Sequence, residues 1–159
     1  MAERIRLAGY VKLAKLWERN AEQAISYHRE YYEKKYADDS RVILVGVYID
    51  ITGQKVIPKR PEMVRLLKDC TLGKISCIEA QTKGYFAANT QELCFLLKYI
   101  FDLPYQIDLL TEDREYRIDT IRNEDGQKQA LKKMADDYVG LYSDDYTKWK
   151  KRLLLEIEK

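Results

Sequence analysis

The most constraining feature of the sequence is an almost unbroken apolar, β-branched run, RVILVGVYI, at residues 41–49. A strand with one wet face alternates apolar and polar residues, whereas a strand covered on both faces of a parallel sheet is apolar throughout. A second run of this kind, KISCIEAQ, occupies residues 74–81, and residues 5–13 and 105–111 are further strand candidates. These runs predict the parallel sheet of an α/β protein.

Segments with helical periodicity separate the strand candidates. Residues 18–36 lack Pro and Gly and repeat apolar side chains at helical spacing. Pro61 suits the first position of a helix that Gly73 ends, and Asn89 is expected to cap the next helix with Glu92 as its capping-box partner. Strands and helices that alternate over short connections predict a mostly parallel central sheet flanked by helices, with right-handed crossovers.

The C-terminal part of the sequence predicts one helix over roughly residues 127–158. A helix of about 30 residues is ~45 Å long, more than a domain of this size needs, so we expect part of its apolar stripe to pack on a partner. The alternative is that the helix folds back onto its own sheet, and Gly140 favours a kink within it. We therefore expect a domain over residues 1–125 and a helical arm over residues 126–159. The residues expected at a dimer interface are Met134, Tyr138, Tyr142, Tyr146, Trp149 and Leu153.

The composition is that of a single globular domain, and it argues against a membrane protein, a secreted protein and a metal-binding protein. The 159 residues are 46% hydrophobic, enough for the core of one domain, and the net charge of +2 does not by itself indicate nucleic-acid binding. No apolar run reaches the ~18 residues of a membrane helix and no signal peptide is evident, so we expect a cytoplasmic protein. Cys70, Cys77 and Cys94 are expected to be buried hydrophobes of a reduced compartment. With His28 as the single histidine and no close cysteine pair, the sequence predicts no metal site and no cofactor.

A set of short motifs follows in fixed order along residues 45–93. An Asp ends a strand, a Thr-Gly loop follows, an Arg-Pro begins a helix, Gly-Lys-Ile ends it, and Phe-Ala-x-Asn-Thr enters the next helix. The matching residues are Asp50, Thr52, Gly53, Arg60, Pro61, Gly73, Lys74, Ile75, Phe86, Ala87, Asn89 and Thr90. In order, spacing and kind of element, this pattern resembles the catalytic domain of the serine site-specific recombinases (the resolvase/invertase group). The resemblance covers roughly residues 5–125 and, by position and length, the final helix.

The resemblance also shows what this chain lacks. In that family a serine hydroxyl attacks a DNA phosphodiester to form a phosphoserine link, and several arginines stabilise the transition state. The family pattern Tyr-x-Arg-Val-Ser reads YVKLA here, so Tyr10 is kept, Lys12 stands for the arginine and Ala14 stands where the serine is expected. The family pattern Arg-Phe-Ala-Arg-Asn reads YFAAN, so Tyr85 and Ala88 replace two arginines.

Asp50 and Arg60 are the catalytic positions that the sequence retains. Loss of the nucleophile removes the covalent route, and loss of each further group costs orders of magnitude in rate. The resemblance therefore implies a catalytically inactive recombinase-like protein of a mobile genetic element that acts as a dimerising partner or regulator. Two alternatives stay open: an active recombinase with a displaced nucleophile, Tyr10 or Tyr85, and a non-DNA interaction domain that reuses the fold.

Full-length members of the family read DNA sequence through a separate part, and no helix-turn-helix or zinc module is evident in this sequence. The cations that could contact phosphates are Lys59, Arg60, Lys83, Lys148, Lys150, Lys151 and Arg152. Asp136, Asp137, Asp144 and Asp145 on the same final helix would repel phosphate. We expect any DNA binding to be weak and independent of sequence. The expected protein partner is a second copy or a related recombinase, bound through the C-terminal helix, and no membrane partner is expected.

Overall fold

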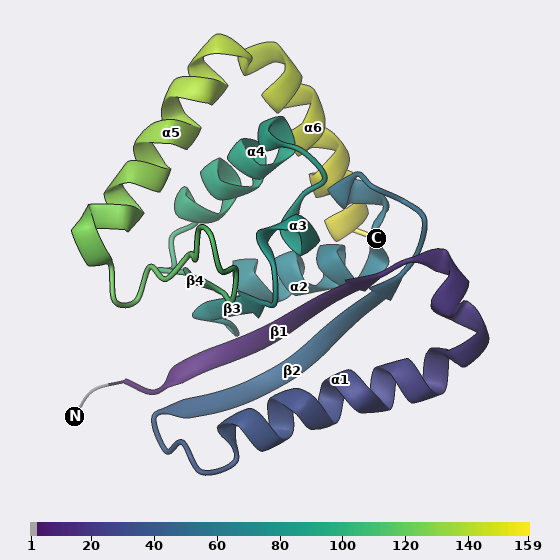
Figure 1. Ribbon diagram of the computed structural model, residues 1–159. Coiled ribbons are helices and arrows are strands. Elements are labelled where there is room, and N and C mark those ends of the chain that lie inside the picture. The colour runs from purple at the N-terminus through teal and green to yellow at the C-terminus, as the bar shows by residue number, and fades with distance from the viewer. Residues whose placement is uncertain (1–2) are drawn as a thin grey trace.

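A four-stranded parallel sheet lies at the centre of the fold (Figure 1). The computed structural model describes residues 3–159, so the first two residues of the domain expected over residues 1–125 lie outside the described residues. The strands are β1 (Ile5–Leu13), β2 (Val42–Ile51), β3 (Cys77–Ala80) and β4 (Asp108–Thr111). Their order is β2-β1-β3-β4, and each neighbouring pair is parallel. The predicted α/β fold class is therefore confirmed.

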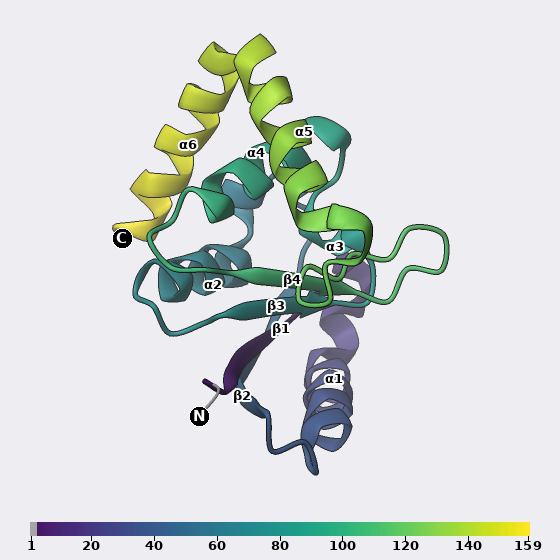
Figure 2. The same cartoon turned by 90° about the vertical axis from the view of Figure 1, so that its left-hand side faces the viewer.

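Helices cover both faces of the sheet (Figure 2). They are α1 (Ala21–Tyr36), α2 (Pro61–Thr71), α3 (Lys83–Phe86), α4 (Thr90–Phe101), α5 (Gln127–Leu141) and α6 (Ser143–Ile157). The 3-10 turns are η1 (Lys15–Asn20), η2 (Ile57–Lys59) and η3 (Glu124–Gly126). α1 packs on one face, whereas α2, α4, α5 and α6 contribute to the core on the other face. No helix within residues 3–159 has the length and apolar character needed to span a membrane.

Strand β1 has a neighbour on each side and buries both of its faces. Tyr10 points into the larger core, below α2 and α4, and Val11 points into the smaller core, against α1, because successive strand residues alternate between faces. Gly9 shares the α1 face, where the ring of Tyr32 lies so near that a β-carbon at Gly9 would stand 2.8 Å from it. The close packing of α1 on β1 therefore requires a glycine at this point.

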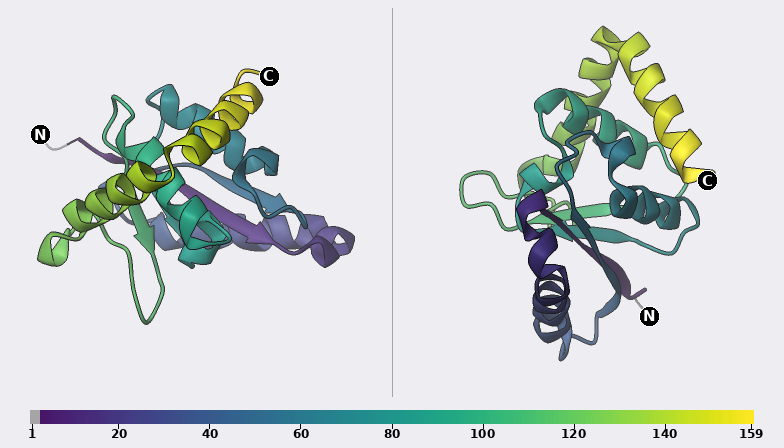
Figure 3. Two further views of the ribbon diagram at one scale, coloured as in Figure 1. Left: turned by 90° about the horizontal axis from the view of Figure 1, so that it is seen from above. Right: turned by 90° about the vertical axis from the view of Figure 1, so that its right-hand side faces the viewer.

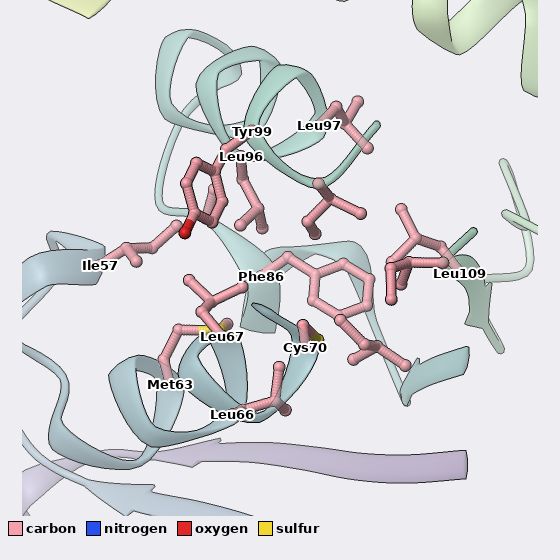
Figure 4. Close-up of a cluster of buried hydrophobic side chains, with 14 of the residues drawn as sticks. Ile57, Met63, Leu66, Leu67, Cys70, Phe86, Leu96, Leu97, Tyr99 and Leu109 are labelled. Atoms are coloured by element: carbon pink, nitrogen blue, oxygen red, sulfur yellow. The ribbon is translucent and has the colours of Figure 1, made fainter. Parts of the chain in front are cut away.

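The larger core is filled by side chains from α2 and α4 (Figure 4). Its buried residues include Met63, Leu66, Leu67 and Cys70 from α2, Leu96, Leu97 and Tyr99 from α4, and Phe86 and Leu109. Cys70, Cys77 and Cys94 are free and buried, as predicted. Burial raises the pKa of the Cys70 thiol to about 12, so Cys70 packs as a small apolar residue and is not a thiolate nucleophile.

The predicted helix boundaries are largely confirmed, with one correction. Pro61 begins α2, and Gly73 follows its end with a φ of +74°. The side chain of Asn89 caps α4 by accepting the N–H of Glu92 at 2.9 Å. The capping-box role of Glu92 is wrong: its carboxylate accepts hydrogen bonds from the Ile57 backbone and the Trp149 indole instead.

The expectation of one long C-terminal helix is also wrong. The helix breaks at Tyr142, whose φ of −125° and ψ of 42° are not helical, two residues after Gly140. Helix α6 then turns back and packs on α2, η2 and α4 (Figure 3). The physical reason is an aromatic docking site on α4, where Phe95 lies 5.3 Å from Tyr146 and 5.8 Å from Trp149 between ring centroids. Burial of these large rings outweighs the few helical hydrogen bonds lost at the break.

This packing divides the residues expected at a dimer interface. Tyr146, Trp149 and Leu153 are buried in the chain's own core, so the expectation that they face a partner is wrong. Met134 and Tyr142 stay on the surface, with 39% and 43% of their area exposed. The surface that α5 leaves for a partner is thus narrower than the sequence predicted.

Candidate functional site

The retained positions gather at the carboxyl ends of β1 and β2, where sites of parallel α/β proteins usually form. Lys12 and Asp50 are register partners across these two strands. The N-terminus of α2 follows, and the short helix α3 lies against β1. This is the end of the sheet at which the sequence places the family's chemistry.

Asp50 anchors the start of α2. Its carboxylate is buried and accepts the backbone N–H groups of Glu62 and Met63, each at 2.9 Å, and the hydroxyl of Tyr10 at 2.8 Å. A carboxylate at a helix N-terminus satisfies N–H groups that lack helical partners and interacts favourably with the helix dipole. Burial, followed by the negative charge of Asp50, raises the pKa of Tyr10. Tyr10 is therefore a protonated hydrogen-bond donor.

Arg60 is fully buried, with none of its surface exposed. Its Nε donates to the Lys55 carbonyl at 3.1 Å, and Nη2 donates to the same oxygen. Its Nη1 donates to the carbonyls of Tyr85 at 2.7 Å and Phe86 at 3.2 Å. The guanidinium thus joins the loop after β2 to α3. The expectation that Arg60 contacts DNA is contradicted, because its donors are engaged and none reaches the surface.

Four positions depart from the family pattern: Lys12, Ala14, Tyr85 and Ala88. Lys12 is half-buried, and its Nζ lies 3.5 Å from the carbonyl of Thr52. Burial, and then the positive charge of Arg60, lowers the pKa of Lys12. Ala14 is exposed directly before η1, and its methyl group offers no nucleophile.

Tyr85 and Ala88 occupy different surroundings. Tyr85 lies in α3, half-buried, and packs against both cores; burial raises the pKa of its phenol, which keeps it protonated. Ala88 is exposed in the loop before α4. Lys12, Asp50, Arg60 and Tyr85 are thus brought together beyond the carboxyl ends of β1 and β2.

Some of the expected DNA contacts come together elsewhere. Lys59, Lys148 and Arg152 line one groove of about 360 Å³ between η2 and α6, and Trp149 forms part of its wall. Asp145 lines the same groove and reduces its positive charge. Lys83 lies outside this groove, with its Nζ 5.7 Å from the centre of the Tyr116 ring. Lys150 and Lys151 also lie on α6, outside the groove lining.

Sequence reasoning missed the role of Glu92, which is buried on α4. Its Oε2 accepts the N–H of Ile57 and the indole N–H of Trp149, both at 2.9 Å. Glu92 therefore holds Trp149 in the wall of the groove that Lys59, Lys148 and Arg152 line, which we call the cationic groove. The signal in the sequence was an acidic residue directly before the apolar run LCFLL. Residues 3–159 bring together no group of three His, Cys, Asp or Glu side chains that could hold a metal ion.

No protein-family model matches the chain, and no curated protein matches it significantly. The solved structures that are similar in fold include the following two. One is the N-terminal catalytic domain of TP901-1 integrase, with a TM-score of 0.59, 14% identity, and coverage of 88% of this chain and 97% of that chain. The other is a resolvase family site-specific recombinase from Streptococcus pneumoniae, with a TM-score of 0.54, 15% identity, and coverage of 94% and 99%. The chain thus has the fold of serine recombinase catalytic domains, as its motifs predicted.

Proposed function

We propose that this chain is a catalytically inactive protein with a recombinase fold, which acts as a dimerising partner or regulator of DNA recombination in a mobile genetic element. The observation that carries the proposal is Ala14, which stands at the end of β1 where the resembling family has its serine. An alkyl side chain cannot form the covalent link to DNA. The similarity in fold to an integrase and a resolvase supports the recombination setting.

The surroundings of Ala14 support inactivity independently. Phosphoryl transfer needs donors aimed at the phosphate oxygens, yet the guanidinium of Arg60 is engaged with backbone carbonyls. Tyr10 and Tyr85, the two replacement nucleophiles, both have a raised pKa because they are buried. A phenol held in its protonated form is a poor nucleophile, which disfavours a displaced active site.

The partner role is supported by the outer face of α5. Met134 is 39% exposed and Leu141 79% exposed, and they lie seven residues apart on one side of the helix. Tyr138 borders them, and its ring packs against the tilted ring of Tyr142 with 4.8 Å between ring centroids. Exposed apolar stripes of this kind commonly mark protein contacts. The occupant we propose is a second copy or a related recombinase.

The cationic groove supports weak DNA contact. Lys148 and Arg152 lie one helical turn apart on α6, and Lys59 faces them from η2. Such a cluster binds the phosphate backbone without reading sequence, and its binding weakens as salt rises. Asp145 in the same groove keeps the expected affinity low.

The catalytic part of the proposal is tested by searching for covalent adducts. The purified protein is incubated with a supercoiled plasmid that carries the DNA flanking the protein's own gene, and the mixture is resolved on a denaturing gel. We expect no protein–DNA adduct. An adduct that disappears in Tyr10→Phe or Tyr85→Phe would establish an active, displaced nucleophile and overturn the proposal.

The DNA contact is tested by gel shift over a range of salt concentrations. We expect Lys148→Glu to weaken binding to any duplex and to lower the slope of log affinity against log salt by about 1. Lys34→Glu on α1, a matched change on the opposite face of the sheet, leaves binding unchanged. Absence of binding even at low salt would favour the interaction domain that does not use DNA.

A further inference from the structure

The two edges of the sheet are protected very differently. β4 has four residues, and its outer side pairs with the returning chain, since Thr111 N–H donates to the Ile118 carbonyl and Thr120 N–H donates to the Leu109 carbonyl. β2 has ten residues, and no strand within residues 3–159 lies on its outer side. β2 therefore presents an unpaired row of backbone donors and acceptors.

The composition of β2 does little to block pairing. Residues 42–49 contain no charged residue and no proline, the side chains that usually protect an exposed edge. Ile43 is 40% exposed and Val45 38% exposed. Strand β2 has one irregularity, a β-bulge at Val45, where the register with β1 passes from Leu44 to Gly46. A bulge increases local twist but leaves the flanking residues free to pair.

A groove of about 470 Å³ runs along this edge, between β2 and α1. Leu44 to Val47 form one wall, and Arg29, Glu33 and Tyr36 of α1 form part of the other. Figure 1 shows α1 running alongside β2 for much of its length. Arg29 and Glu33 are exposed, four residues apart, and form no ion pair within residues 3–159.

We propose that β2 pairs antiparallel with β2 of a second copy, so that one sheet of eight strands crosses a two-fold axis. The surface complements itself, which is the requirement of a two-fold interface. Antiparallel pairing sets the exposed apolar side chains of Ile43 and Val45 against those of the partner strand. It also sets the two α1 helices antiparallel on the same face of the sheet, so that Arg29 of one copy approaches Glu33 of the other.

This edge is separate from the partner surface proposed on α5, because α1 and α5 lie on opposite faces of the sheet. A chain with two independent two-fold surfaces assembles beyond a dimer. The edge pairing does not depend on the proposed DNA contact or on the loss of catalysis.

The test measures mass in solution by light scattering across a range of protein concentrations. Val45→Lys places a charge on the edge, and Leu141→Asp disrupts the α5 surface. We expect each single variant to be a dimer and the double variant to be monomeric. Ile121→Lys, at an exposed apolar residue between β4 and η3, is the matched control and keeps the full mass. Circular dichroism establishes that each variant is folded.

A charge swap separates pairing from a folding defect. Arg29→Glu alone should weaken the association, and Arg29→Glu with Glu33→Arg should restore it, because the swapped pair is again complementary. Amide exchange of residues 43–47 should slow as the concentration of the wild type rises, and should not change with concentration in Val45→Lys.

If Val45→Lys has the same mass as its parent in both the wild-type and the Leu141→Asp backgrounds, the edge pairing is overturned. If Leu141→Asp has no effect while Val45→Lys does, the α5 surface fails and the edge pairing stands.

Discussion

The carboxylate Oε2 of Glu92 accepts the indole N–H of Trp149 at 2.9 Å across 57 positions of the chain. The same oxygen accepts the backbone N–H of Ile57, also at 2.9 Å. One buried carboxylate therefore holds α4, α6 and the turn after β2 together. A buried charge with its donors removed is strongly destabilising. The return of α6 to the domain brings the Trp149 donor to Glu92, and it thereby lowers the cost of burying this carboxylate.

Trp149→Phe should lower the free energy of unfolding by about 2 kcal/mol, because hydrogen bonds to charged groups contribute that order of energy. Phenylalanine keeps most of the ring packing against Phe95 and loses the N–H donor. Urea unfolding followed by circular dichroism measures the change.

The matched control is Tyr146→Phe in the same cluster. The Tyr146 hydroxyl is buried without a hydrogen-bond partner, so its removal should leave stability unchanged or slightly raise it. Equal losses in the two variants would show that the bond from Trp149 to Glu92 contributes no more than an unpaired hydroxyl, which contradicts the prediction.

The same contact explains what sequence reasoning could and could not reach. Helical periodicity placed Tyr146, Trp149 and Leu153 on one apolar stripe that was expected to face a partner, and all three are buried in the chain's own core. It could not decide which surface covers them, because a stripe that packs on a partner and one that packs on α4 have the same period. The deciding groups, Phe95 and Glu92, are distant in sequence, and only the tertiary fold brings them under α6.

Arg60→Lys should destabilise the fold by roughly 2–4 kcal/mol, because a lysine cannot reproduce the fork of donors with which the buried guanidinium meets three backbone carbonyls. Thermal and urea unfolding measure the loss. If Arg60 contacted DNA, the lysine variant would keep the stability of the wild type and would bind DNA more weakly in the gel shift.

The motif that contains Arg60 shows a general limit. The Arg-Pro pair was correctly placed at the start of a helix, since Pro61 begins α2. The role of the arginine was not predictable, because burial of a guanidinium depends on where α3 lies relative to the loop after β2. Lys59, the residue before it, is exposed and lines the cationic groove. A motif fixes a position on an element, and the direction of each side chain follows from packing.

Gly9→Ala should cost about 1–3 kcal/mol of stability, the usual range for forcing a methyl group into a packed core. The added β-carbon would lie 2.8–2.9 Å from three atoms of the Tyr32 ring. That ring is held in place by a hydrogen bond from its hydroxyl to the Glu79 carbonyl at 3.3 Å. Gly53→Ala is the control, since nothing lies within 4 Å of its added β-carbon. A neutral Gly9→Ala would show that α1 can move away from β1 at little cost.

His28, the single histidine of the chain, should titrate with a midpoint below 6.5, because burial lowers its pKa. Its ring resonances can be followed by NMR without overlap from another histidine. The unfolded chain then binds a proton near pH 6.5, where the folded chain does not. Stability is therefore unaffected by His28 above the unfolded pKa, and it falls as the pH drops from about 6.5 to the lower folded pKa.

The stability consequence has its own measurement. His28→Gln removes the titration, so the urea midpoint of the variant should depend less on pH than that of the wild type between about pH 6.5 and the midpoint found by NMR. Carboxylates have most of their titration below this window and affect both proteins alike. The Nδ1 of His28 is buried without a hydrogen-bond partner, so a proton gained there has no acceptor to stabilise it. A midpoint at or above 6.5 would mean that the ring is hydrated in solution and that α1 packs more loosely on the sheet than its tyrosines indicate.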